Sequence, residues 1–193
     1  MTPLSIVPAR VDDLERFLDL LEEVADWLAA RGIQQWPPGH FRRSSDFYAE
    51  SIARHEVQLA FVGDELVGAF RVLLREPIVW PDVVEDDAVY VYTLAVRRAW
   101  ADQGLGGRML EWAGKRAASL GRRYVRLDCI TDNTFLRDYY TRAGFVERGE
   151  IEAHFPAPVG SLRLRRYEKP VGTAEAAQPA AVPLSRGTVS GRG

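Results

Sequence analysis

Residues 88–96, AVYVYTLAV, form a nearly unbroken apolar run, and three glycines follow within four positions in WADQGLGGRML, residues 100–110. β-Branched and aromatic residues dominate the run, which is typical of a central strand that is buried on both faces. Apolar residues then recur at helical spacing up to about Leu120. A strand, a glycine-rich turn and a helix in this order predict a site where main-chain N–H groups hold an anion such as phosphate.

Two familiar phosphate-binding motifs fit these glycines poorly. A nucleotide P-loop requires Lys and then Ser or Thr after its last glycine, whereas Arg108 and Met109 follow Gly107 here. A dinucleotide-binding fingerprint would place its third glycine at position 109, which is Met109. Taken alone, the glycines are also compatible with a tight turn that binds nothing.

The rest of the chain predicts one mixed α/β domain over residues 1–170, with its elements in the order βααβββαβαββ. Residues 171–193 are rich in Ala, Gly, Pro and Ser without apolar periodicity, which predicts a disordered tail. The predicted strands are 4–7, two within 57–74 around a Gly63-Asp64 turn, 88–96, 124–130, 145–151 and 161–168. The predicted helices are 12–31, 44–55, the helix that follows the glycines, and 134–142, with a loop at 34–40.

Composition narrows the classes of function. The formal net charge of −2 gives no electrostatic support for a nucleic-acid partner. Cys129 is the single cysteine, so an internal disulfide and a cysteine-based zinc cluster are excluded, and we predict no metal site. The sequence has no signal-peptide pattern and no apolar stretch long enough for a membrane span, which predicts a soluble cytoplasmic protein without a membrane partner.

Two segments, YTLAVRRAWADQGLGGRML and DNTFLRDYYTRAGF, resemble motifs of the GCN5-related N-acetyltransferase (GNAT) family in the same order and spacing. The resemblance covers residues 4–169, with its specific motifs between 92 and 146. It implies a mixed, mostly antiparallel central sheet of six or seven strands with about four helices. It also implies that the fourth and fifth strands splay apart, and that acetyl-coenzyme A (acetyl-CoA) is the acyl donor.

The family's Arg/Gln-x-x-Gly-x-Gly/Ala loop holds the pyrophosphate of acetyl-CoA through main-chain N–H groups, and Gly104 and Gly106 match its glycines. Ala101 replaces the usual Arg or Gln, so we expect weaker binding, for which Arg108 is one candidate to compensate. The resemblance places Asn133, which is also a natural helix cap, near the pantetheine arm, and main-chain groups of the fourth strand along that arm. The implied cofactor-binding residues are Leu94, Ala95, Val96, Ala101, Asp102, Gln103, Gly104, Leu105, Gly106, Gly107, Arg108 and Asn133.

Tyr140 matches the family's usual acid, four residues before the glycine of Gly-Phe, and we expect its neighbour Tyr139 to point elsewhere because helical neighbours lie about 100° apart. A phenol of pKa ~10 facing a thiolate near ~8.5 donates a hydrogen bond more readily than a proton.

A primary amine of pKa ~10.4 is neutral in about one molecule in 2,500 at pH 7, so removing its proton costs ~4.6 kcal/mol that the site must supply. No carboxylate on the strand at 88–96 is an obvious base, so the base stays unassigned.

The family implies a primary amine of a small molecule or peptide as the acceptor, and this amine attacks the thioester of acetyl-CoA directly in a ternary complex. Candidate acceptor-binding residues are Trp36, Tyr90, Tyr92 and His154, of which Trp36 and His154 are expected on loops, and packing is an equal alternative for them. A non-catalytic acyl-CoA-binding or sensing module on the same fold is a second hypothesis, favoured by Ala101 and the missing carboxylate. A homodimer is compatible with the sequence.

Overall fold

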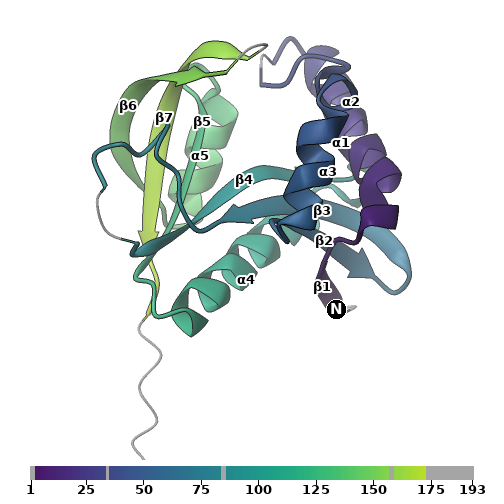
Figure 1. The fold of residues 1–193 in the computed structure, drawn as a ribbon, viewed down its shortest axis with the longest axis horizontal. Coiled ribbons are helices and arrows are strands. Elements are labelled where there is room, and N and C mark those ends of the chain that lie inside the picture. The colour runs from purple at the N-terminus through teal and green to yellow at the C-terminus, as the bar shows by residue number, and fades with distance from the viewer. Residues whose placement is uncertain (1–2, 34, 84–85, 157–158, 173–193) are drawn as a thin grey trace, which may run out of the picture.

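The computed structural model describes residues 3–33, 35–83, 86–156 and 159–172. Seven strands form one sheet in the spatial order β1-β2-β3-β4-β5-β7-β6 (Figure 1). The strands are β1 (Leu4–Pro8), β2 (Val57–Val62), β3 (Glu65–Leu73), β4 (Ala88–Val96), β5 (Tyr124–Ile130), β6 (Val146–Phe155) and β7 (Gly160–Pro170). The helices are α1 (Leu14–Ala29), α2 (His40–Arg43), α3 (Ser45–Ala53), α4 (Leu105–Ser119) and α5 (Thr134–Arg142), with short 3-10 helices at Val11–Asp13 and Arg98–Trp100.

This architecture confirms the predicted mixed sheet and the predicted order of its elements. The expectation of about four helices missed α2, a single turn that begins at His40 directly after Pro37, Pro38 and Gly39. A four-residue helix has too few periodic positions to stand out in a sequence. None of the helices within the described ranges has the length and hydrophobicity that crossing a bilayer requires.

Helices α4 and α5 cover one face of the sheet. Met109 and Ala113 lie four residues apart on α4, and both are fully buried in a cluster with Val89 of β4 and Leu127 of β5. This is the spacing by which a helix turns one apolar face toward a sheet. The helix that carries the glycine-rich turn is therefore fixed against the two central strands.

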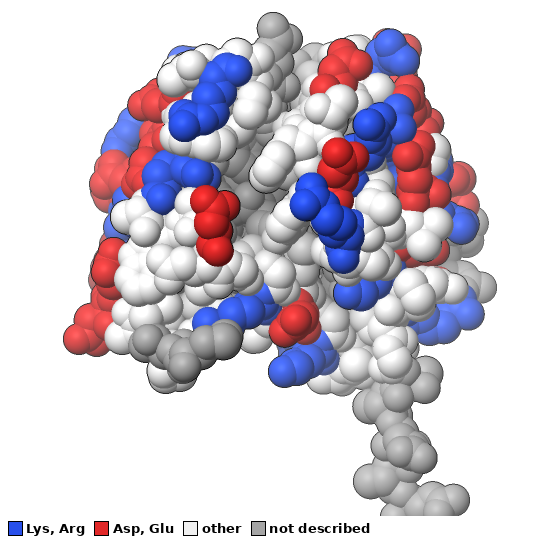
Figure 2. Space-filling view, turned by 180° about the vertical axis from the view of Figure 1, so that it is seen from behind, with Lys and Arg blue, Asp and Glu red and all other residues white. Residues whose placement is uncertain are grey.

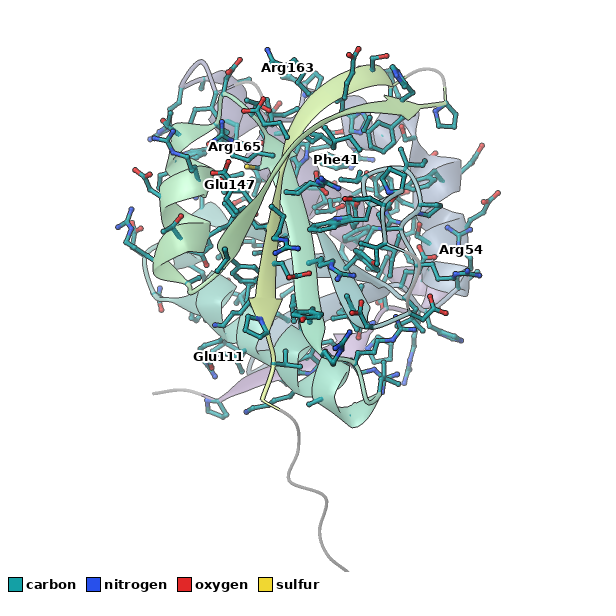
Figure 3. All side chains as sticks on the ribbon, turned by 90° about the vertical axis from the view of Figure 1, so that its left-hand side faces the viewer. Phe41, Arg54, Glu111, Glu147, Arg163 and Arg165 are labelled. Atoms are coloured by element: carbon teal, nitrogen blue, oxygen red, sulfur yellow. The ribbon has the colours of Figure 1, made fainter. Side chains whose placement is uncertain are left out.

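The opposite face is covered in two parts. Helices α1 and α3 cover the half that contains β2 and β3, where Phe17 and Ile52 pack on Leu59. Over β5, β6 and β7 the cover is the connection between β3 and β4, whose Val79 and Trp80 are buried with residues of β4, β6 and β7. Figure 1 shows α1 and α3 on one side of the molecule and α5, β6 and β7 on the other. Figure 3 shows the outer β6–β7 pair, where Arg165 lies 3.0 Å from Glu147.

The predicted splay of the fourth and fifth strands is confirmed. β4 and β5 are parallel neighbours only from Ala88↔Tyr124 to Val91↔Leu127, although β4 continues to Val96 and β5 to Ile130. Just beyond the last pair, Thr93 has a φ of +54°, and the register between β3 and β4 shifts between Ala69 and Arg71. A bulge of this kind bends its strand. The two central strands therefore part at a fork.

Most of the predicted tail, residues 173–193, lies outside the described residues. At its start, the Val171 N–H donates a hydrogen bond of 2.8 Å to the carbonyl oxygen of Arg123, and the Val171 side chain packs on the cluster beneath α4. The described fold thus includes residue 171, the first residue that the sequence assigned to the tail.

Candidate active site

The start of α4 presents main-chain donors at an open surface. Gly104 is its N-cap, with a φ of +72° and no side-chain cap, and the first hydrogen bond of the helix runs from the Arg108 N–H to the Gly104 carbonyl oxygen at 3.2 Å. The N–H groups of Leu105, Gly106 and Gly107 precede that bond, so the helix itself gives them no acceptor. Apart from the neighbouring residues and the helix's own backbone, no described heavy atom lies within 4 Å of the Cβ position at Gly104 or Gly107. We call this region the helix mouth.

The approach to the helix mouth is a sharply bent loop. Ala101 is half-buried and extended, whereas Asp102 has a φ of +60°, a conformation that few residues other than glycine adopt readily. Asp102, Gln103 and Gly104 are exposed. Because Ala101 carries only a methyl group, this position offers an anion at the mouth no polar side-chain contact.

A side chain at Gly106 would require Tyr139 to move. A Cβ at this residue would lie 2.5 Å from the hydroxyl oxygen of Tyr139. The Tyr139 ring stacks on Phe135 at 6.4 Å and touches the ring of Tyr140 at 5.6 Å between centroids. Tyr139 does point differently from Tyr140, and it points at the helix mouth, which the sequence did not show.

Tyr140 lies in the core beneath the fork. The residue is only 6% exposed, and its ring centroid lies 5.5 Å from that of Tyr167 and 6.0 Å from that of Phe145. Burial, followed by the nearby Cys129 and Asp128, raises the pKa of Tyr140 well above 10. The phenol is therefore neutral at physiological pH and is a hydrogen-bond donor.

On the other face of the sheet, Tyr92 and Asp128 are the first residues beyond the last paired residues, Val91 and Leu127. The Tyr92 hydroxyl and Asp128 Oδ1 are buried, and neither has a hydrogen-bond partner among the described residues. Such groups are rare inside proteins, because each one that is left unpaired costs free energy. The fork thus holds two buried polar atoms that a ligand or water can satisfy.

The pKa of Asp128 is raised to about 7, first by burial, which the Tyr92 hydroxyl opposes and the Glu76 carboxylate reinforces. Burial, then Asp128 and Glu76, raise the pKa of Tyr92 well above its usual value. Glu76 is held in place by the N–H groups of Ile78 at 2.9 Å and Val79 at 3.2 Å, both of which donate to its Oε1. Sequence reasoning named neither Asp128 nor Glu76.

The other predicted acceptor-binding residues are placed differently. Tyr90 is buried, and its hydroxyl accepts a hydrogen bond of 3.2 Å from Arg126. Trp36 packs edge-on against Phe41 at 5.2 Å. The loop expected at His154 is wrong, because this residue lies within β6, exposed, with Nδ1 2.7 Å from the Ser161 hydroxyl. The residues on either side of His154 pack into the cluster of Tyr92, so its own side chain lies on the opposite face of β6.

Asn133 caps α5, as its position predicts. Its Oδ1 accepts a hydrogen bond from the Leu136 N–H at 3.1 Å, and its Nδ2 donates to Gln35 Oε1 at 3.0 Å, so it also joins α5 to the segment between α1 and α2.

Three further predicted residues lie on β4 beyond the fork. Leu94 and Val96 pack toward α4, and Ala95 packs toward α1.

The helix mouth, the fork and Tyr140 fit an elongated anionic ligand with a reactive end. Figure 2, which views the molecule from behind, shows the surface hollowed between the half with α1 and the half with α5, with mostly uncharged atoms along the hollow. The main-chain donors and the dipole of α4 suit a phosphate. A Cβ at Gly106 would meet the Tyr139 hydroxyl, so glycine at this position leaves room for that side chain beside the helix mouth.

The sequence matches a known family and a known relative. Residues 21–145 match the family model described as the acetyltransferase (GNAT) family. The uncharacterized N-acetyltransferase YesJ of Bacillus subtilis is 34% identical over 145 residues, which cover 72% of this chain and 79% of YesJ.

Solved structures share the fold. A GNAT-family acetyltransferase from Listeria monocytogenes has a TM-score of 0.71 at 24% identity, with 86% of this chain and 94% of that one covered. The putative acetyltransferase yncA from Salmonella typhimurium, solved with its cofactor acetyl-CoA, has a TM-score of 0.61 at 15% identity, with 93% and 99% covered.

The raised pKa of Asp128 predicts how stability depends on pH. The folded protein holds the Asp128 proton up to about pH 7, whereas the unfolded chain loses it near ~3.9, so this group lowers the free energy of unfolding progressively as pH rises between these values. Asp128→Asn removes the charge. We expect the variant to gain roughly 2–4 kcal/mol relative to wild type between pH 4 and pH 8, measured by urea unfolding. An equal stability difference at both pH values would contradict the assigned pKa.

Proposed function

The chain belongs to the GNAT family of acetyltransferases, and on this premise we propose that it transfers an acetyl group from acetyl-CoA to a primary amine of a small molecule or peptide by direct attack in a ternary complex. The observation that carries the proposal is the open helix mouth beside the fork, because it offers an anchor for a diphosphate next to a slot for an extended arm.

We assign the diphosphate to the N–H groups of Leu105, Gly106 and Gly107. Ala101 adds no polar contact, so the affinity rests on these donors and on the dipole of α4. The pantetheine arm then lies between β4 and β5, where the main chain of residues 94–96 pairs with it as a strand would pair. A main-chain N–H of β4 beyond the fork stabilises the thioester oxygen as it gains charge.

Bound acetyl-CoA supplies an acyl group on a good leaving group, a thiolate of pKa near ~8.5. We propose that the Tyr140 hydroxyl faces the sulfur of that thiolate. Because burial raises the pKa of Tyr140 well above 10, the phenol stays protonated and donates a hydrogen bond to the thiolate as it leaves. Full proton transfer from so weak an acid is uphill, so the proton moves only after the carbon–sulfur bond has broken.

Gly106→Glu tests the anchor. A side chain at this position meets Tyr139, and a carboxylate there repels a phosphate. We expect acetyl-CoA to bind at least about 100-fold more weakly by calorimetry, which corresponds to ~2.7 kcal/mol. The control is Lys115→Glu, which places the same side chain at an exposed position of α4, where affinity should change little. Intact affinity in a folded Gly106→Glu protein would refute this placement of the diphosphate.

Thiol release from acetyl-CoA across a panel of alkylamines, amino sugars and peptides with free N-termini tests the reaction, and Tyr140→Phe tests the acid. We expect amine-dependent release by the wild type, at least about tenfold slower turnover in Tyr140→Phe, and retained affinity for acetyl-CoA. Tyr167→Phe removes a buried hydroxyl that has no hydrogen-bond partner among the described residues of the same cluster, and it should keep the wild-type rate. Unchanged turnover in Tyr140→Phe would remove this residue from the mechanism. Binding without release from any amine would favour the sensing module instead.

A further inference from the structure

We propose that Asp128 is the general base of the transfer, that the Tyr92 hydroxyl positions the acceptor nitrogen beside it, and that the acceptor enters as an ammonium ion drawn by Asp128 and Glu76. This inference rests on the proposed function, because it names the residue that prepares the amine at the same site. The residues come from β4, β5 and the connection between β3 and β4.

Position is the first reason. Asp128 stands at the fork on the face of the sheet opposite to α4, and Tyr140 packs on the α4 side. The two are close enough that the Asp128 charge contributes to the raised pKa of Tyr140. A base on one face and an acid on the other thus flank the slot assigned to the thioester, which lets an amine arrive from one side while the thiolate leaves toward the other.

Unpaired atoms are the second reason. Asp128 Oδ1 and the Tyr92 hydroxyl are buried, next to each other in the sheet, and without hydrogen-bond partners among the described residues. An ammonium group has three donors and satisfies both oxygens at once. Glu76, whose own carboxylate is held by two main-chain N–H groups, adds a second negative charge beside this point.

Two arginines near Asp128 bind other groups. Arg166 is its neighbour across the β5–β7 pair, and its two terminal guanidinium nitrogens bind Asp82 at 2.6 Å and the Arg148 carbonyl oxygen at 3.3 Å, whereas its Nε has no hydrogen-bond partner among the described residues. Arg126, two residues earlier on β5, binds Glu168 at 2.7 Å and Asp87 at 2.9 Å. Neither arginine hydrogen-bonds Asp128 Oδ1, which has no partner among the described residues and can accept from a cation that enters from solvent.

Three further titratable groups near Asp128 are neutral at pH 7. Tyr92 from β4, Tyr140 from α5 and Cys129 on β5 all have a pKa raised above its ordinary value, mainly by burial. The pKa of Asp128, about 7, leaves it substantially ionised at physiological pH and basic enough to accept a proton, which is the compromise that suits a general base. Without a base, only about one alkylamine molecule in 2,500 is ready to attack at pH 7.

The proposed transfer moves two protons away from the nitrogen. The ammonium gives one proton to the Asp128 carboxylate, which later releases it to solvent. The neutral nitrogen attacks the thioester carbon, so a carbon–nitrogen bond forms and the carbon–sulfur bond breaks. The nitrogen loses its second proton to solvent, and the departing sulfur takes a proton from Tyr140, which regains one from solvent. The products are the acetylated amine, the free thiol and one proton.

The pH dependence of Asp128→Asn tests the base. The full-length wild type and variant are compared from pH 5.5 to 9.5 with the alkylamine of the panel that the wild type acetylates fastest. We expect wild-type kcat/KM to rise with pH and to level off above about pH 7, the pKa of Asp128. At pH 7 the kcat/KM of the variant should be about 100-fold lower than that of the wild type. It should keep rising about tenfold per pH unit without levelling off, because the variant relies on amine that is already neutral. Its affinity for acetyl-CoA should stay within about threefold.

Hydroxylamine, which is largely neutral at pH 7, serves as a second acceptor that needs little help from a base. With this acceptor, the kcat/KM of Asp128→Asn should fall less than about tenfold below that of the wild type. Asp138→Asn, at an exposed aspartate on α5, is the matched control and should behave as the wild type does. A wild-type pH profile in Asp128→Asn, or an equal loss with both acceptors, would overturn the assignment of the base.

Tyr92→Phe provides an independent readout if Asp128→Asn folds poorly. The Tyr92 hydroxyl lowers the pKa of Asp128, so its removal should move the inflection of the wild-type profile to higher pH. An inflection that stays in place would contradict the proposal. A wild-type protein that binds acetyl-CoA and releases no thiol with any amine would overturn the proposed function itself, which is a different result from an unchanged pH profile.

Discussion

Main-chain pairing between β4 and β5 stops at Val91 and Leu127, and the chemistry of the site depends on that stop. If the two parallel strands had stayed paired to their ends, the main-chain groups of β4 beyond Val91 that face β5 would be hydrogen-bonded to β5. Instead the bulge at Thr93 bends β4 away, and the strand carries its free edge toward the start of α4. The helix mouth and the fork are therefore adjacent because one strand leads from one to the other.

The two faces of the sheet suit different substrates. On the α4 side, main-chain donors and Tyr140 suit a donor molecule with phosphates at one end and a thioester at the other. On the opposite side, Tyr92, Asp128 and Glu76 form a small acidic site beneath the connection between β3 and β4. Because a backbone anchor does not depend on one side chain, the family's usual Arg or Gln can be absent at Ala101 while the loop keeps its shape.

The features that sequence predicted are local in the chain. A strand, a glycine-rich turn and a helix follow one another within about thirty residues, and the cap at Asn133 lies three residues from the N–H that it accepts. Asp128 escaped notice because its neighbours, Leu127 and Cys129, alternate with it as the core face of a strand, which makes the position between them look solvent-exposed. Its burial depends on a connection some fifty residues earlier in the chain. The same holds for the bond from Asn133 to Gln35, which joins residues 98 positions apart.

A structure of the protein with coenzyme A bound is the most direct measurement of the central claim. We predict diphosphate oxygens within hydrogen-bonding distance of the N–H groups of Leu105, Gly106 and Gly107, with the sulfur between β4 and β5 and facing the Tyr140 hydroxyl. Coenzyme A bound elsewhere, or a fork closed by side chains while the coenzyme is bound, would contradict the account.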